Sequence, residues 1–83
     1  MDLIKNKVLE VIKRTFNVDK LSVEEDELRE GALEQWDSLG HLNLLMELEK
    51  EFGIKFSLND IERTRTFHGI VSVIKEKINA GKA

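Results

Sequence analysis

The segment Gln35-Trp36-Asp37-Ser38-Leu39-Gly40-His41 contains the side chains with the clearest capacity for chemistry. A serine hydroxyl becomes a hydrolytic nucleophile when a neighbouring base removes its proton and a third group orients that base. His41 lies three residues after Ser38, but the sequence shows no third group to orient it and no oxyanion-stabilising groups. We therefore predict no catalytic residue and expect His41 to be structural. Asp37 and Ser38 are also common N-terminal caps of helices, which gives the segment a purely structural interpretation.

Composition gives little support to metal, nucleic-acid or membrane sites. The chain has no cysteine, and its two histidines, His41 and His68, are 27 positions apart without other ligands at a metal-binding spacing. The net charge is −3 and the basic residues are scattered, whereas nucleic-acid binding needs a basic stripe. No run approaches the about 18 consecutive apolar residues of a membrane helix, and no signal peptide is visible. We expect a cytoplasmic protein, and at 83 residues a single domain spanning 1–83 that is too small to enclose a catalytic cleft and a substrate.

The helix that Ser38 begins is expected to run over 38–52 and to end at Gly53, and it carries two apolar sectors. One sector is an ordinary core stripe, formed by Leu44, Leu45, Leu48 and Phe52. The second sector is adjacent to it and is formed by Leu39, Leu42 and Met46, while Gly40, Asn43, Glu47, Lys50 and Glu51 take the remainder. Together the two sectors are about twice as wide as the ~100° that a bundle helix buries. Either this helix is buried more deeply than its neighbours, or the second sector is a docking patch beside Ser38.

Apolar residues at spacings of three and four predict two further long helices. The first covers about 2–16, with Asp2 as its N-cap, and the last begins after the cap residue Thr66. Their expected core residues are Leu3, Ile4, Val8, Val11, Ile12 and Phe16 in the first helix and Phe67, Ile70, Val71, Val73, Ile74 and Ile78 in the last. A short helical turn is expected over 57–62. The predicted fold is all-α, a small bundle of three main helices and one short helix.

A long loop over 17–37 separates the first two helices. A loop of this length is uncommon in a compact domain. Its scattered apolar residues are expected to pin it across the helix ends, as in a packed surface loop. These residues are Val18, Leu21, Val23, Leu28 and Leu33.

From the start of the second helix to the last helix, the chain resembles the acyl carrier protein family. The matching residues are Asp37-Ser38-Leu39, Leu42, Leu44, Met46, Leu48-Glu49, Glu51-Phe52, Ile54, Phe56, Ile61 and Thr66-Phe67. The amphipathic first helix and the long loop before Ser38 also fit the family. Asp-Ser-Leu alone is a weak motif, but at the start of this helix, after such a loop, it is a specific one.

The resemblance implies that a transferase attaches 4′-phosphopantetheine to Ser38 through a phosphodiester, and that the arm's thiol holds an acyl group as a thioester. Asp37 and Leu39 would flank the attachment point, with Asp37 contributing charge for recognition or capping the helix. Gly40 would leave room for an incoming enzyme, or is simply a tolerated first-turn glycine. Trp36 either shields the base of the arm or packs in the core. Such a chain is a carrier and not itself an enzyme.

The partners implied by the resemblance are a phosphopantetheinyl transferase and enzymes that load or process acyl or aminoacyl groups. Leu42, Met46, Glu47 and Glu51 are the expected contact residues, with Lys50 as the only base expected nearby. The alternative is a helical interaction module without a prosthetic group, which binds its partner through Leu39, Leu42 and Met46.

The expected pathway is a specialised one. Carriers of primary fatty acid synthesis are strongly acidic, whereas this chain has a net charge of −3 and carries Gly40, Asn43 and Lys50 on its second helix. The stretch from Trp36 to Leu44 is more similar to free-standing carriers of polyketide, peptide or modified-sugar assembly. We expect a monomer whose cargo, fatty acyl, malonyl-type, hydroxyacyl or aminoacyl, stays open.

Overall fold

Four α-helices follow one another along residues 3–20 and 24–81, the part of the chain that this computed structural model describes. They are α1 (Leu3–Phe16), α2 (Ser38–Phe52), α3 (Leu58–Arg63) and α4 (Phe67–Gly81). A 3₁₀ turn, η1 (Glu25–Glu27), lies in the loop between α1 and α2. The all-α prediction, with three long helices and one short helix, is confirmed.

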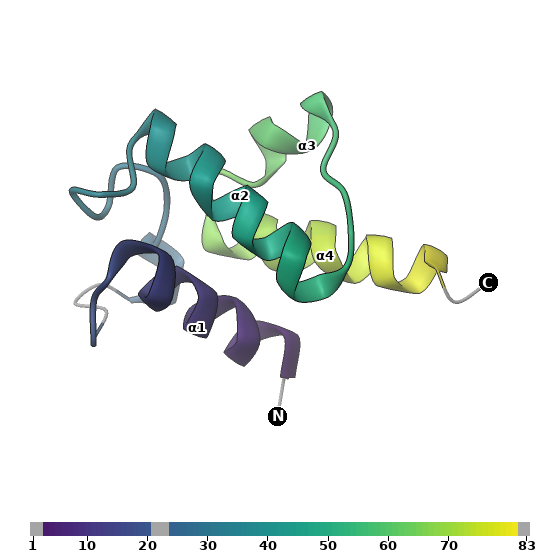
Figure 1. Ribbon diagram of the computed structural model, residues 1–83, viewed down its shortest axis with the longest axis horizontal. Helices are drawn as coiled ribbons and strands as arrows, with labels where there is room; N and C mark the ends of the chain where they lie inside the picture. The colour runs from purple at the N-terminus through teal and green to yellow at the C-terminus, as the bar shows by residue number, and fades with distance from the viewer. Residues whose placement is uncertain (1–2, 21–23, 82–83) are drawn as a thin grey trace.

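The long helices α1, α2 and α4 form one group, and the short α3 lies above α2 and α4 in this view (Figure 1). Helix α1 runs in the direction opposite to α2 and α4, and it packs against both of them. Helix α4 also contacts α3 and η1. Because the long loop joins the end of α1 to the start of α2, the beginning of α2 lies at the loop end of the bundle, away from the two chain termini (Figure 1).

The apolar stripes of the three long helices meet in one core. Its members are Val8, Val11, Ile12 and Phe16 of α1, Leu44, Leu45 and Leu48 of α2, and Phe67, Ile70, Val71, Val73 and Ile74 of α4. The core prediction for Leu3 is wrong: Leu3 is the first residue of α1 and is 77% exposed, whereas the adjacent Ile4 packs against the core. Ile4, Phe52 and Ile78 are half-buried and pack against the edge of the core.

The long loop is fixed by buried side chains and by backbone hydrogen bonds. Leu28 and Trp36 are buried, and Leu33 packs against the core. The N–H of Phe67 donates to the carbonyl of Leu28 at 2.8 Å, which ties the loop to the start of α4. The expected pinning role is therefore confirmed for Leu28 and Leu33, and Val18 is half-buried. The same expectation for Leu21 and Val23, and the N-cap expected at Asp2, fall outside the described residues.

The helix ends follow the chemistry expected from the sequence. Gly53 ends α2 with φ of 65°, in the left-handed region that favours glycine. Ser57 begins α3 with a capping box, in which its side chain accepts from the N–H of Asp60 and the Asp60 carboxylate accepts from the N–H of Ser57. The hydroxyl of Thr66 accepts from the N–H of Gly69 at 3.0 Å, so the predicted cap of α4 is confirmed.

Asp60 joins α3 to α4. Its carboxylate lies 2.8 Å from the ammonium of Lys77, and only 12% of its side chain is exposed. The hydrogen bond from Lys77, followed by those from Ser57, lowers the pKa of Asp60 from 3.8 to about 2. Because the pKa is lower in the folded state, the stabilisation is present above pH 3.8 and is lost as the pH falls through about 2.

We expect Asp60→Asn to lower the free energy of unfolding at pH 7 by about 2 kcal/mol, since each pKa unit corresponds to about 1.4 kcal/mol. The variant should also lose less stability than the wild type between pH 4 and pH 2. Urea unfolding at pH 7, 4 and 2 measures both effects. Glu62→Gln is the control, because Glu62 forms an exposed pair with Arg65 that contributes below about 1 kcal/mol. Parallel acid profiles for wild type and Asp60→Asn would contradict this role.

Candidate functional site

Ser38 is the first residue of α2, and it is exposed to solvent. The helix start beneath it is held by Asp37, whose side chain accepts from the N–H of Gly40 at 2.8 Å and whose carbonyl accepts from the N–H of His41 at 2.8 Å. Asp37 is therefore the N-cap, and Ser38 keeps its hydroxyl free of that task. The next side chain, Leu39, is 68% exposed. Ser38, Asp37 and Leu39 thus form one open surface at the loop end of the bundle.

Gly40 does not leave room for a partner, contrary to the expectation from the sequence. It is buried, and a Cβ atom added to it would lie 2.0 Å from the carbonyl oxygen of Gln35. The loop therefore returns directly against the first turn of α2, and only glycine permits this close approach. Gly40 serves the packing of the segment that presents Ser38.

Gly40→Ala is expected to destabilise the protein by about 1–3 kcal/mol, because the carbonyl of Gln35 must move to admit the methyl group. At an ordinary helix position the same change stabilises the protein by about 1 kcal/mol. The sign of the change in unfolding free energy therefore distinguishes close packing at Gly40 from an ordinary helix position. Asn43→Ala, at an exposed position of the same helix, is the control and should change stability by no more than about 0.5 kcal/mol. Thermal or urea unfolding that finds Gly40→Ala more stable than the wild type would refute this packing.

Trp36 and His41 lie beneath the Ser38 surface, inside the core. Trp36 has no exposed area and stacks on Phe16 with ring centroids 5.7 Å apart, so its core role is confirmed. His41 is 2% exposed and is structural, as the sequence indicated. The Nε1–H of Trp36 donates to Nδ1 of His41 at 3.0 Å. Burial lowers the pKa of His41 below 6.5.

The second apolar sector of α2 is a surface patch. Leu39, Leu42 and Met46 are 68%, 47% and 55% exposed, whereas Leu44 and Leu48 on the core sector have no exposed area. The interpretation of this helix as more deeply buried is therefore wrong. Exposed apolar side chains that continue along one helix face beside Ser38 form a contiguous surface suited to a partner. We call Leu39, Leu42 and Met46 the α2 patch.

The acidic residues beside the α2 patch are already paired within the protein. Arg14 of α1 lies 3.3 Å from the carboxylate of Glu51 and 3.9 Å from that of Glu47, and Lys7 lies 3.5 Å from Glu51. The hydrogen bond from Arg14 lowers the pKa of Glu51. The sequence-based view of Lys50 as the only nearby base is therefore wrong, because α1 brings two more. Glu51 links α1 to α2, and Glu47 also lies 3.7 Å from Lys50.

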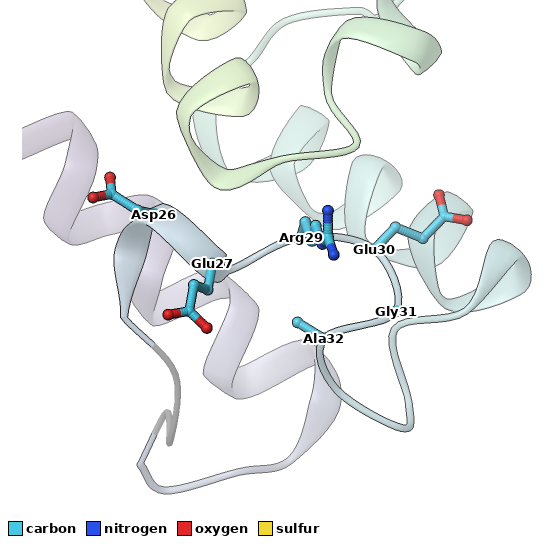
Figure 2. A pocket seen from close by; sticks show the side chains of 6 residues that line it. All are labelled: Asp26, Glu27, Arg29, Glu30, Gly31 and Ala32. Atoms are coloured by element: carbon cyan, nitrogen blue, oxygen red, sulfur yellow. The ribbon is translucent and has the colours of Figure 1, made fainter.

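A hollow of about 550 Å³ lies elsewhere, under the loop before α2. It is lined by Asp26, Glu27, Arg29, Glu30, Gly31 and Ala32. Figure 2 shows the carboxylates of Asp26 and Glu30 extending in opposite directions instead of converging. Asp26 pairs with His68 at 2.6 Å and Glu30 with Arg65 at 3.1 Å, so both acids have structural partners. The hollow has no convergent group that would fix a ligand.

Neither a metal centre nor a membrane span is found in residues 3–20 and 24–81. No three side chains among His, Cys, Asp and Glu come together there as metal ligands. None of the helices in that part of the chain is long and apolar enough to cross a membrane. The site residues predicted from the sequence come together instead at the surface formed by Asp37, Ser38 and Leu39.

Comparison with known proteins shows which family the chain resembles. A family model described as a phosphopantetheine attachment site matches residues 6–74. The chain is 34% identical over 82 residues to an acyl carrier protein of Petrotoga mobilis, covering 93% of this chain and 94% of the relative. It is 30% identical over 79 residues to a D-alanyl carrier protein of Streptococcus uberis, covering 93% of this chain and 98% of the relative.

The fold has a counterpart among solved structures. The solution NMR structure of a holo acyl carrier protein from Geobacter metallireducens superimposes with a TM-score of 0.82 at 22% identity, over 94% of this chain and 88% of that one. At this identity the likeness concerns the fold. Together with the family match over 6–74 and the curated carriers at 30–34% identity, it leads to one conclusion. The chain belongs to the acyl carrier protein family, whose members hold their cargo on covalently attached phosphopantetheine.

Proposed function

We propose that Ser38 is the residue to which the phosphopantetheine arm is attached. The observation that supports this most strongly is its place as an exposed hydroxyl at the first residue of α2, on a helix start that Asp37 caps. An attachment residue must reach the active site of a transferase without unfolding, and an exposed first-turn serine meets that requirement. The buried Trp36 and Gly40 on either side keep the backbone of the segment in place.

The residues around Ser38 suit a phosphodiester. The N-terminus of a helix favours an anion because its first N–H groups and the helix dipole point toward it, a contribution of about 0.3–1 kcal/mol. Leu39, 68% exposed, offers an apolar surface beside the attachment point. The arm supplies a terminal thiol that holds the acyl group as a thioester, and this chain supplies the rigid presentation. We assign no catalytic residue to the chain.

The proposed partners are a phosphopantetheinyl transferase and the enzymes that load or process the acyl or aminoacyl group. We propose that they contact the α2 patch, with Leu42 and Met46 losing water on docking and Glu47 adding a modest negative field. Glu51 is the weaker candidate, since its carboxylate is engaged with Lys7 and Arg14. A single domain, a monomeric state, a cytoplasmic location, a specialised pathway and the absence of nucleic-acid and membrane partners stay predictions.

Leu42→Ala and Met46→Ala are each expected to slow loading by a transferase about tenfold, the effect of losing about 1–2 kcal/mol at the centre of an interface. The loss should vary little with salt, because it is apolar contact area that is removed. Leu58→Ala is the matched control, since Leu58 is 85% exposed but lies on α3. Unchanged rates for both α2 variants would place recognition elsewhere, most simply on the loop before Ser38.

The charge contribution is tested separately. Glu47→Lys is expected to slow loading mildly at low salt, and the defect should shrink toward ~0.15 M salt, where the screening length is about 8 Å. Glu51 is not reversed together with Glu47, because Glu51→Lys would face Lys7 and Arg14 and weaken the α1–α2 contact. Glu51 is therefore left unchanged in this test.

Peptide mapping tests the attachment residue directly. Trypsin cleavage after Arg29 and Lys50 releases the peptide 30–50, in which Ser38 is the only residue with a hydroxyl side chain. After treatment with coenzyme A and transferase, the added mass is expected on this peptide. Addition to a peptide carrying Thr15, Ser57 or Ser72 would overturn the proposal.

A further inference from the structure

A chain of buried hydrogen bonds runs from the loop through α2 to the end of α3. The Nε1–H of Trp36 donates to Nδ1 of His41 at 3.0 Å. Nε2 of His41 lies 3.3 Å from the hydroxyl oxygen of Thr64, and that hydroxyl donates to the carbonyl of Asp60 at 2.8 Å. Trp36 and Thr64 have no exposed area and His41 is 2% exposed. We call these three side chains the relay.

The relay has one consistent arrangement of protons. Indole Nε1 is always a donor, so Nδ1 of His41 must be an unprotonated acceptor. The Thr64 hydroxyl gives its proton to a backbone carbonyl, that of Asp60 at 2.8 Å or that of Ile61 at 3.1 Å, so its oxygen accepts from His41 and Nε2 must bear the proton. His41 is therefore neutral, with its proton on Nε2.

Protonation of His41 breaks the relay at its first bond. A proton on Nδ1 would face the N–H of Trp36 across 3.0 Å, and two donors cannot satisfy each other. Burying an unpaired donor costs about 1–3 kcal/mol, and burying the imidazolium adds to that cost. Consistent with this, burial lowers the pKa of His41 below 6.5. The stabilisation from neutral His41 is then complete above pH 6.5 and declines as the pH falls below 6.5.

The charged groups around His41 do not reverse this effect. Glu30 of the loop raises the pKa of His41 and Arg65, after α3, lowers it, and the two are paired with each other at 3.1 Å. The carboxylate of Asp60 on α3 is turned to Lys77 of α4 at 2.8 Å. Helix α1 places an uncharged group next to the relay, the ring of Phe16, which stacks on Trp36. Burial is the dominant influence on the pKa of His41, and it outweighs a hydrogen bond to the backbone of Ile61, which raises that pKa.

Trp36 and His41 bracket the three residues Asp37, Ser38 and Leu39. We propose that His41 is a positioning residue for Ser38: as a neutral Nε2–H imidazole it ties both ends of this segment to α3 through Thr64, and its protonation loosens the segment, so that Ser38 is loaded less well at mildly acidic pH. The proposal rests on Ser38 being the attachment residue. It adds a pH dependence that originates in the carrier and not in the transferase.

Nitrogen-15 NMR of the imidazole rings tests the relay without any loading reaction. At pH 7 the wild type should show His41 with Nδ1 unprotonated and Nε2 protonated, and it should titrate below pH 6.5. Trp36→Phe keeps an aromatic ring but removes the donor, so the titration midpoint of His41 should rise. Backbone amide signals of Asp37 to Leu39 should shift with the same midpoint in the wild type. A proton on Nδ1 at pH 7, or a midpoint at or above 6.5, would overturn the relay.

Loading rates test the positioning role. Wild type, His41→Gln and His68→Gln are treated with transferase from pH 8 to pH 5, and each rate is divided by that of His41→Gln at the same pH, which cancels the pH dependence of the enzyme. His41→Gln retains a hydrogen-bonding amide that does not titrate. The wild-type ratio should fall about twofold at the His41 midpoint and toward tenfold one pH unit below it. His68→Gln, which changes an exposed histidine, should follow the wild type.

The NMR and loading experiments distinguish failure of the attachment proposal from failure of the positioning proposal. A wild type that is never loaded at any pH contradicts the attachment proposal, while the NMR result on the relay stands by itself. A wild-type ratio that stays flat from pH 8 to pH 5, with His41 shown by NMR to titrate in that range, overturns the positioning role. Circular dichroism at each pH identifies unfolded variants. If His41→Gln is unfolded, His41→Asn, whose amide also does not titrate, replaces it as the reference, and wild-type loading must fall relative to it.

Discussion

Leu44→Ala and Leu48→Ala are each expected to lower the free energy of unfolding by about 2–5 kcal/mol, which is enough to unfold much of the protein. Both side chains have no exposed area, and they fill the space between α2 and the helices beside it. An 83-residue chain buries a thin core, so the loss of one large side chain cannot be redistributed. Urea unfolding followed by circular dichroism at 222 nm measures the change.

Leu42→Ala and Met46→Ala are the matched comparison on the same helix. They are 47% and 55% exposed, and each should change stability by no more than about 0.5 kcal/mol. Phe52→Ala should fall between the two groups, because Phe52 is half-buried at the edge of the core. Equal destabilisation on both sectors of α2 would show that the α2 patch is part of the core and would remove the proposed docking surface.

The fold and the position of Ser38 could be predicted from local sequence signals. Apolar residues at helical spacing in α1, α2 and α4 indicate which faces meet, since each helix must bury its own stripe. Gly53 and Thr66 mark helix ends through their own backbone and side-chain chemistry. The two sectors of α2 are likewise a property of one helix, and only their exposure had to come from the structure.

The features that could not be predicted depend on contacts between distant parts of the chain. Glu51 looks like an exposed acid in the sequence, yet its partner Arg14 is 37 residues away and is brought to it by the packing of α1 on α2. His41 meets Thr64 across 23 residues. Gly40 is close to Gln35 in the sequence, but the approach of that carbonyl depends on the path of the whole loop. Leu3 shows the opposite error, because it continues the apolar stripe of α1 in the sequence and is nevertheless 77% exposed.

The pairing of Glu47 and Glu51 with α1 also changes the view of recognition. If the acids beside the α2 patch were free, a partner would be guided mainly by its basic residues. Because Arg14 and Lys7 partly neutralise them, apolar contact with Leu42 and Met46 is expected to dominate. The salt series for Glu47→Lys and Met46→Ala separates these two contributions.

Ser38→Ala is expected to abolish attachment of the arm completely while leaving the fold unchanged. Asp37, not Ser38, is the N-cap of α2, and alanine is a favourable residue inside a helix, so stability should stay within about 0.5 kcal/mol of the wild type. Ser72→Ala is the matched control, because Ser72 is an exposed serine on α4. Circular dichroism before the reaction verifies that all three proteins are folded.

The measurement that tests the central claim most directly is the intact mass of wild type, Ser38→Ala and Ser72→Ala after incubation with coenzyme A and a broad-specificity phosphopantetheinyl transferase. Wild type and Ser72→Ala should each gain one phosphopantetheine, and Ser38→Ala should gain none. A folded Ser38→Ala that still gains the arm would show that the attachment residue is wrong. A wild type that stays unmodified with several such transferases would contradict the assignment of this chain as a phosphopantetheine carrier.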